Sequence, residues 1–551
     1  MSAELASPAT EATGDGDSAG NALPVLIIGA GPGGLTAALE LLRRSPTHRP
    51  IVIEALDQVG GLARTVRHNG NGLDIGGHRF FSKVAWVTHW WREILPLSPA
   101  MEAYRPGSDA SRNLEAADAL AADAPERALL VRPRLSRILY LRKFFDYPIS
   151  LSTRTLQNLG VLRVAWIGAS YLKARIAPIR PERNLEDFFV NRFGRRLYET
   201  FFRDYTQKVW GVACREISPE WGAQRIKGLS ITRAVRHALT RVTRRGTHDI
   251  AQHGTETSLI ERFLYPKRGP GQMWESVAER VRDAGGEIAL TTRLCGLRHN
   301  GTRIVSAICE DASGARREIR CSAVISTMPI KDLADALDPS PPADVARIAR
   351  GLCYRDFITV GVLLSRLRPG PYVRSGFANH LVPDTWIYVQ EPDVLMGRVQ
   401  IFNNWSPAMV ADSARIWLGL EYFCTEGDAL WQMSDQQLRD LARRELVKLG
   451  FADDADVLDM RVIKVPKAYP AYVGSYGEFG RIREFLDGIE NLFPVGRNGM
   501  HRYNNQDHSM VSARLAVECI LDPARDKTAI WNVNVEQEYH EEAAQPAARS
   551  R

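Results

Sequence analysis

The chain has 551 residues, of which 45% are hydrophobic and 25% are charged. This balance is typical of a globular protein and excludes a mainly disordered one. The formal net charge of +7 is spread along the chain without a dense basic run, so the sequence predicts no nucleic-acid partner.

Seven cysteines are scattered along the chain, and no two of them stand at CxxC spacing. This pattern indicates neither a metal site nor a disulfide framework. The first residues lack the basic and apolar parts of a signal peptide, and no apolar run of about 18 residues is present. We therefore expect a cytoplasmic, reduced protein that holds no metal.

In chain order, residues 1–22 are small and polar and are predicted to form a disordered tail. An apolar strand, an apolar-periodic helix and a second strand follow in ALPVLIIGA, GLTAALELLRR and RPIVIEA. This is a βαβ opening, and we assign residues 23–100 to the first part of a nucleotide-binding domain.

The rest of the chain is predicted to interrupt that domain and then complete it. Near residues 106–126 a small, acidic, Ala-rich stretch is predicted to be a surface insertion or loop, with one short helix as an alternative within it. A helical substrate or cap region is predicted at residues 101–285, and an antiparallel-sheet substrate domain at residues 336–485. The second and third parts of the first domain are predicted at residues 286–335 and 486–525. A C-terminal tail is predicted at residues 526–551. The sequence therefore predicts an α/β protein with interleaved domains.

The strongest local signal is GAGPGG, in which Gly29, Gly31 and Gly34 form GxGxxG between an apolar strand and a helix. Gly29 permits the tight turn, Gly31 lets the backbone approach a pyrophosphate, and Gly34 lets the helix pack closely on the strand. The pyrophosphate would then lie at the helix N-terminus. Glu54 ends the next strand, where it can accept hydrogen bonds from ribose hydroxyls. The alternative is a glycine-rich turn without a ligand.

The segment EALDQVGGLARTV resembles the stretch that follows the ribose acid in glutathione-reductase-like flavoproteins, notably flavin amine oxidases, protoporphyrinogen oxidases and UDP-galactopyranose mutases. The resemblance implies that Gly61 lets the backbone pass the cofactor, and that Arg64 and Thr65 serve its phosphate and ribityl region. FPVGR resembles the closing segment of these proteins, in which Gly496 approaches the ribityl chain and Arg497 follows. The implied cofactor is FAD, in a glutathione-reductase-like Rossmann fold interleaved with a mixed helical and antiparallel-sheet substrate domain.

The segment GLDIGGHRFFSK resembles a stretch of the mutases in which a Gly-x-His loop lies beside the flavin ring. The resemblance places Gly76 and Gly77 among the cofactor-binding residues and His78 next to the flavin. The alternative for His78 is a purely structural histidine.

Two further segments resemble the substrate side of the mutases. DYTQKVWG implies that Tyr205, Thr206 and Trp210 line the substrate pocket, with aromatic core packing as the alternative. GRNGMHRYNNQD has the spacing of the mutase segment in which a tyrosine contacts the substrate diphosphate. Tyr503 and the start of the last helix are therefore expected to bind an anion.

The chain also departs from the mutases at two positions. Mutases carry a second diphosphate-binding arginine four residues after an Arg-Ile pair, whereas AQRIKGLS has Arg225 followed by Leu229. A leucine cannot hold a diphosphate, and Arg398 in MGRVQIFNNW is the replacement that we consider. Asn505 stands where the mutases have an acid.

Three functions remain open on this resemblance. The first, which we expect, is an FAD-dependent oxidoreductase of the amine-oxidase and protoporphyrinogen-oxidase type, whose substrate gives a hydride to the flavin. The second is a non-redox mutase of nucleotide sugars, in which the reduced flavin acts as a nucleophile. The third is a flavin-binding protein without turnover. A small-molecule substrate, such as a sugar phosphate or an isoprenoid-linked sugar, suits either enzyme.

A last feature is a predicted helix that mixes apolar residues with cations near residues 156–176. Such a mixture suits peripheral contact with an anionic membrane surface. A core helix with snorkelling cations is the alternative. The residues that we consider are Arg154, Leu159, Val161, Leu162, Arg163, Val164, Trp166, Ile167, Lys173, Arg175 and Arg180.

Overall fold

The computed structural model describes residues 23–105, 107, 109–147, 149, 153–219, 222, 262–369 and 379–534. The predicted N-terminal tail, most of the predicted C-terminal tail, the side chain of Arg154 and the comparison at Arg225 and Leu229 lie outside these residues.

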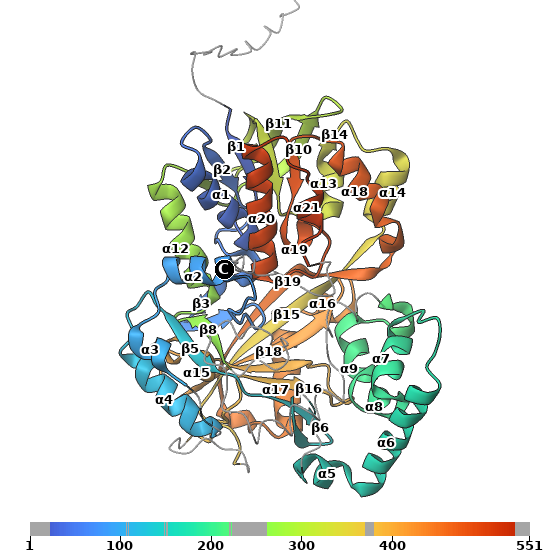
Figure 1. The fold of residues 1–551 in the computed structure, drawn as a ribbon. Helices are drawn as coiled ribbons and strands as arrows, with labels where there is room; N and C mark the ends of the chain where they lie inside the picture. The colour runs from blue at the N-terminus through green and yellow to red at the C-terminus, as the bar shows by residue number, and fades with distance from the viewer. Residues whose placement is uncertain are drawn as a thin grey trace, which may run out of the picture.

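Within the described residues, a five-stranded parallel sheet forms the centre of the first domain, in the order β20-β13-β1-β2-β9 (Figure 1). Its strands are β1 (Val25–Ile28), β2 (Pro50–Ile53), β9 (Glu287–Ala289), β13 (Ala323–Ser326) and β20 (Leu492–Pro494). The central strand β1 pairs in parallel with β2 on one side and with β13 on the other. The sheet thus joins segments from both ends and from the middle of the chain, and the predicted α/β fold is confirmed.

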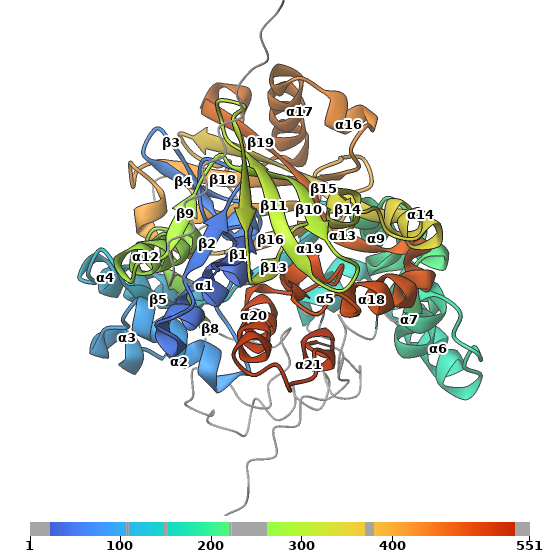
Figure 2. The ribbon, with the colours of Figure 1, turned by 90° about the horizontal axis from the view of Figure 1, so that it is seen from above.

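Both faces of this sheet are covered (Figure 2). On one face α1 (Pro32–Arg44) packs against both α12 (Pro270–Asp283) and α20 (Gln506–Leu521). A second sheet, in the order β12-β11-β10-β14, shares a buried apolar cluster with the other face. Its strands, and the helices beside it, are β10 (Arg293–His299), β11 (Ile304–Glu310), β12 (Arg316–Arg320), β14 (Leu337–Asp338), α13 (Ile330–Ala336), α14 (Ala343–Arg350) and α18 (Phe479–Asp487).

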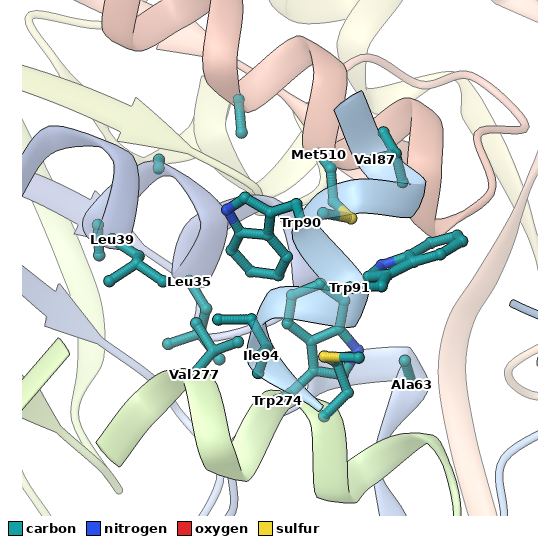
Figure 3. Packing of buried hydrophobic residues seen from close by; sticks show 14 of the residues in the cluster. Leu35, Leu39, Ala63, Val87, Trp90, Trp91, Ile94, Trp274, Val277 and Met510 are labelled. Atoms are coloured by element: carbon teal, nitrogen blue, oxygen red, sulfur yellow. The ribbon is translucent and has the colours of Figure 1, made fainter. Parts of the chain in front are cut away.

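Tryptophans fill the core on the helical face of the first domain. Trp90 and Trp91 of α2 (Ala85–Ile94) lie beside Leu35 of α1, Trp274 of α12 and Met510 of α20 (Figure 3). The rings of Trp90 and Trp274 have centroids 6.2 Å apart. Each large ring buries 150–250 Å² of surface at most sites of this kind, so α2 holds the two flanking helices together.

A seven-stranded sheet forms the second part of the described structure, in the order β19-β15-β18-β17-β16-β6-β7. Its strands are β6 (Ser136–Tyr140), β7 (Lys143–Asp146), β15 (Leu352–Leu364), β16 (Trp386–Val389), β17 (Arg398–Ile401), β18 (Ile416–Cys424) and β19 (Val457–Gly474). All neighbours are antiparallel except β16 and β6. Helix α17 (Asp435–Leu449) packs on the sheet through Leu438, Ala442 and Leu446.

The remaining described elements lie around these sheets. A helical region at the edge of the large sheet consists of α5 (Thr153–Leu159), α6 (Val161–Ile176), α7 (Leu185–Phe193), α8 (Arg195–Phe201) and α9 (Arg203–Trp210). The segments between the two domains are β3 (Thr65–His68), β4 (Asn71–Asp74), α3 (Pro99–Ala103), α4 (Ala110–Ala122), β5 (Leu129–Pro133) and β8 (Arg262–Pro266).

Three stretches differ from the expected boundaries. The stretch near residues 106–126 contains the 13-residue helix α4, whose Leu114 and Ala117 are buried, so it is packed rather than looped out. Helix α12 packs on α1, which associates residues 270–283 with the first domain and not with the helical region. Residues 526–534 are no tail, because α21 (Thr528–Trp531) buries Ile530 and Trp531.

Asp74 is a buried carboxyl group where β4 meets the first domain. Tyr265 donates a hydrogen bond to its Oδ2, and Thr65 donates to its Oδ1 at 2.8 Å. Burial raises the pKa of Asp74 to about 7, against the opposing effect of these two hydrogen bonds. The group is therefore neutral in the folded protein at mildly acidic pH.

This shifted pKa predicts a pH-dependent stability. Between about pH 4 and pH 7 the unfolded chain has lost the Asp74 proton while the folded protein keeps it, so raising the pH lowers the free energy of unfolding by up to about 1.4 kcal/mol per pH unit. Asp74→Asn removes this contribution, and its thermal midpoint should fall less than that of the wild type over this range. Exposed Asp283→Asn is the matched control. Parallel pH profiles for Asp74→Asn and the wild type would contradict the assignment.

Candidate functional site

The turn after β1 has the backbone geometry that a dinucleotide site requires. Gly29 has φ +98°, and a Cβ atom there would overlap the hydroxyl of Thr327. A Cβ atom at Gly34 would overlap the carbonyl oxygen of Gly29, so helix α1 can approach the strand this closely only with glycine. These glycines are required by packing within the protein itself.

Gly31 faces a different neighbour. A Cβ atom there would lie 3.7 Å from the Cα atom of Gly61, which itself has φ +53°. Two bare backbone segments thus face each other at the N-terminus of α1, and Pro32 occupies the first helical position, where an N–H group would have no partner within the helix. This cradle is what the pyrophosphate of a dinucleotide needs.

Glu54 lies beside a cavity of about 520 Å³ at the carboxyl ends of β1 and β2. Its carboxylate accepts hydrogen bonds from the N–H groups of Ala30 at 2.8 Å and Leu56 at 3.0 Å. These contacts orient the group and leave further lone pairs for ribose hydroxyls. Residues 292–295 and 327–329 also line the cavity, and together these residues would surround the adenosine half of the cofactor.

Arg64 and Thr65 differ in what their side chains contact. Arg64 donates to the carbonyl of Gly61 at 2.9 Å, and burial lowers the pKa of its guanidinium. The hydroxyl of Thr65 donates to Asp74 and accepts from the N–H group of Gly271 at 3.0 Å. Both hydrogen bonds of the Thr65 hydroxyl are internal, and its carbonyl accepts from Nε2 of Gln58 at 3.0 Å, so a direct role of Thr65 in holding the cofactor stays a prediction.

The closing segment brings Gly496 to the same edge of the sheet. Gly496 has φ +80°, and its N–H group donates to the hydroxyl of Ser512 in α20 at 3.1 Å. The next residue, Arg497, turns toward aromatic rings: its Cζ atom lies 4.8 Å from the ring centroid of Tyr503 and 5.5 Å from that of Tyr469. Arg497 was predicted to bind the cofactor, but its guanidinium lies among the substrate-side candidates.

The loop around His78 connects the cofactor side with these rings. Nε2 of His78 donates to the carbonyl of Ile75 at 2.8 Å, and burial lowers the pKa of the imidazole to about 4, so the ring is neutral at pH 7. A Cβ atom at Gly77 would overlap the indole of Trp386. Gly76 has φ +78° and an open neighbourhood. The glycines therefore let the loop close onto Trp386.

The predicted pocket residues belong to a larger group of rings, which we call the aromatic cluster. The centroids of Trp210 and Tyr503 are 6.4 Å apart, so two segments almost 300 residues apart in sequence do converge. Tyr469 stacks on Tyr503 with centroids 5.5 Å apart. Tyr205 meets Tyr388 edge-on at 5.8 Å. The cluster consists of Tyr205, Trp210, Trp386, Tyr388, Phe423, Tyr469 and Tyr503.

Arg398 is buried in the middle of this cluster. Its Nε donates to the hydroxyl oxygen of Tyr205 at 2.7 Å, and its Nη1 donates to Glu421 at 3.1 Å. Its Cζ atom lies 4.7 Å from the ring of Phe423 and 5.1 Å from that of Trp386. Because the Tyr205 oxygen accepts from a guanidinium, its own O–H group is directed elsewhere and can donate to an anion.

Arg79 is a second cation that sequence reasoning missed. Its Cζ atom lies 5.3 Å from the Trp386 ring, on the same indole that Arg398 approaches. Burial, followed by the nearby Arg134, lowers the pKa of Arg79 to about 10. Among the described residues, the guanidinium groups that lie against rings of the aromatic cluster are those of Arg79, Arg398 and Arg497, and Arg398 is paired with the carboxylate of Glu421.

Two other predictions find less support in the geometry. Thr206 is buried, and its hydroxyl forms a hydrogen bond with Cys214, so this side chain is engaged within the protein. At the start of α20 the N–H group of Asn505 donates to Nδ1 of His508 at 3.2 Å. Asp507 adds a buried carboxylate in the first turn, where it accepts from Ser82 at 3.0 Å. That carboxylate opposes the binding of a substrate anion there.

Comparison with known proteins identifies the family. Residues 32–488 match the family described as flavin containing amine oxidoreductase. The chain belongs to this family. As a flavin amine oxidoreductase it binds FAD and is an oxidoreductase, and the facing glycines, Glu54 and the adjoining cavity fit the cofactor.

Solved structures share this fold at low sequence identity. A reduced UDP-galactopyranose mutase is 20% identical with a TM-score of 0.70, over 93% of this chain and 99% of its own. A protein named as a protoporphyrinogen oxidase, from Exiguobacterium sp. 255-15, is 17% identical with a TM-score of 0.62, over 90% and 98%. A putrescine oxidase is 16% identical with a TM-score of 0.56, over 91% and 99%. At these identities the likeness concerns the fold.

Gly29 and Gly34 are required by packing, whereas Gly31 has room for a Cβ atom, and this difference allows a test of the FAD site. Gly31→Val places two methyl groups where the pyrophosphate must pass, while its Cβ atom is tolerated by the protein at 3.7 Å. The variant should fold but be purified without flavin absorption. Gly480→Val, at a position with no atom within 4 Å, is the matched control and should stay yellow. A fully flavinylated Gly31→Val protein would contradict the site.

Proposed function

We propose that this flavoenzyme oxidises a small anionic substrate, a sugar phosphate or an isoprenoid-linked sugar phosphate. The observation that carries the proposal is the charge of the aromatic cluster, where three guanidinium groups face one carboxylate among the described residues. A protonated amine would be repelled by this balance, whereas a phosphate would be attracted. The charge thus argues against an amine substrate, despite the family's name.

The residues of the chain would act by binding and orientation. Bound FAD supplies a hydride acceptor for an oxidoreductase or, once reduced, a nucleophilic nitrogen for a mutase. Arg398 and Tyr205 would bind an anionic group of the substrate on one side of the aromatic cluster. Arg497 and Tyr503 would bind an anionic group on the other side. The rings of Trp386 and Tyr469 would exclude water from the reacting carbon. Neutral His78 leaves this pocket without an additional positive charge.

A non-redox mutase of nucleotide sugars is the second candidate. It is favoured by the contact between Trp210 and Tyr503, which joins the two segments that resemble mutase motifs. It is disfavoured by Asn505, which stands in place of an acid. Arg79 and Arg497 could nevertheless provide the charge for a diphosphate.

One anaerobic experiment separates these candidates. Oxidised enzyme is mixed with sugar phosphates, isoprenyl phosphate sugars and, as a control class, primary amines, and flavin bleaching is recorded. We expect bleaching by a phosphate-bearing substrate only. Reduced enzyme is then given UDP-galactopyranose, and the products are analysed for the furanose form. Furanose without net flavin oxidation would establish the mutase, and bleaching by amines alone would refute the anionic substrate.

Tyr503→Phe tests the anion site once a substrate is known. Hydrogen bonds to charged groups contribute roughly 1.5–3 kcal/mol, so loss of this hydroxyl should lower kcat/KM by roughly 10- to 150-fold. FAD content should not change, because Tyr503 lies among the rings of the aromatic cluster. Tyr140→Phe makes the same change in β6 and should leave kcat/KM intact. An unchanged kcat/KM for Tyr503→Phe would remove this residue from the substrate site.

A further inference from the structure

Helix α6 presents an apolar stripe to solvent. Its most exposed large apolar side chains are between 61% and 84% exposed, and they are Val161, Leu162, Trp166, Leu172 and Ile176. In the remaining described residues the highest value for such a side chain is 51%, at Leu395. Leu156 of the neighbouring helix α5 is also exposed. The predicted alternative, a core helix, is therefore wrong for this face of α6.

The opposite face of α6 explains why the stripe has a fixed orientation. Val164 and Ile167 pack into an apolar cluster with Phe201 of α8. The hydroxyl of Ser170 accepts from the N–H group of Arg196 at 3.1 Å. The helix lies at the outer edge of the helical region (Figures 1 and 2). The stripe from Leu162 to Ile176 is about 21 Å long at 1.5 Å per residue, and it is held outward by packing behind it.

Cations accompany this stripe without acidic residues. Residues 161–176 contain Arg163, Lys173 and Arg175 and no Asp or Glu, and none of the three cations forms an ion pair with another described residue. At 100° per residue around the helix axis, Arg163 and Arg175 lie on either side of the stripe. Lys173 lies within the stripe, and its long side chain can place the ammonium group at the headgroups while its methylene groups stay in the apolar layer. Trp166 is of the type enriched at membrane–water interfaces. The surface is thus complementary to negative headgroups above an apolar layer.

We propose that α6 docks the protein on an anionic lipid surface, lying parallel to the membrane plane. None of the helices in the described ranges is long and apolar enough to cross a bilayer, and α6 has 16 residues with three charges. Its apolar stripe enters the boundary between headgroups and acyl chains, and its cations contact the phosphate groups. The inference holds for either candidate reaction, because it uses no residue of the FAD site or of the aromatic cluster.

Flotation of the full-length holoenzyme with vesicles tests this surface. We expect co-flotation with vesicles that contain phosphatidylglycerol, weaker binding to pure phosphatidylcholine, and release at high salt. Leu172→Glu should lower the partition coefficient about tenfold, because it replaces an inserted apolar side chain by a carboxylate that the negative headgroups repel. Leu458→Glu makes the same change at an exposed position of β19 and should bind like the wild type. Arg163→Gln with Arg175→Gln should remove the preference for anionic vesicles.

Folding and self-association are controlled in the same samples. Flavin content and the thermal midpoint verify that each variant is intact, and light scattering gives the molar mass. Absence of co-flotation at low salt would overturn the proposal, as would equal binding of Leu172→Glu and the wild type. A dimer that dissociates in Leu172→Glu, without vesicle binding by the wild type, would assign the stripe to a second copy of the chain and would equally overturn it.

Discussion

The close contact between the ends of β1 and β13 is the constraint on which the rest of the structure depends. Both the N–H group and the hydroxyl of Thr327 donate to the carbonyl of Ile28 at 2.9 Å. This contact leaves no room for a side chain at Gly29, and it sets the turn into α1. Because all strands of this sheet are parallel, their carboxyl ends meet at one edge, where Glu54 and Gly496 also lie. The FAD site is therefore a consequence of strand pairing.

The cofactor half of the site was predictable because its signals are local. A buried strand, glycines at fixed spacing and a helix stand within 20 residues, and their meaning depends on backbone geometry that the residues themselves impose. The closing strand around Gly496 needed a resemblance, since its position beside β13 depends on pairing across more than 150 residues. Two adjacent apolar residues show no helical or strand periodicity. The buried pair Ile530 and Trp531 was therefore assigned to the C-terminal tail.

The substrate half was only partly predictable, for physical reasons. Glu421 and Tyr469 lie on strands whose neighbours come from distant segments, and in sequence they look like alternating residues of any sheet. Arg79 follows a recognised loop but was not singled out, because its contact with Trp386 spans some 300 residues. Thr206 lies on the same face of α9 as Trp210, but its hydroxyl is engaged by Cys214, so its role at the substrate site stays a prediction.

The charges around the aromatic cluster set the electrostatics of the proposed substrate site. Burial raises the pKa of Glu421, while Arg398 opposes this shift, so the two groups depend on each other for their charged forms. Such a buried pair contributes little net stability, but it holds Tyr205 and the guanidinium in one arrangement. With Arg398 compensated in this way, the positive charge left over belongs to Arg79 and Arg497, at the two ends of the cluster. Selectivity for an anion would then come from these ends.

Helix α6, with its exposed apolar stripe, and the aromatic cluster share one structural unit. Helix α6 packs on α8, and α8 packs on α9, which carries Tyr205 and Trp210 into the aromatic cluster. Stacked rings link these helices, with Phe202 lying 4.9 Å from both Phe189 and Phe193 of α7. Close-packed protein interiors transmit small displacements rather than absorb them. Under the proposal for α6, a bound lipid surface would therefore act through α8 and α9 on the wall that holds Tyr205.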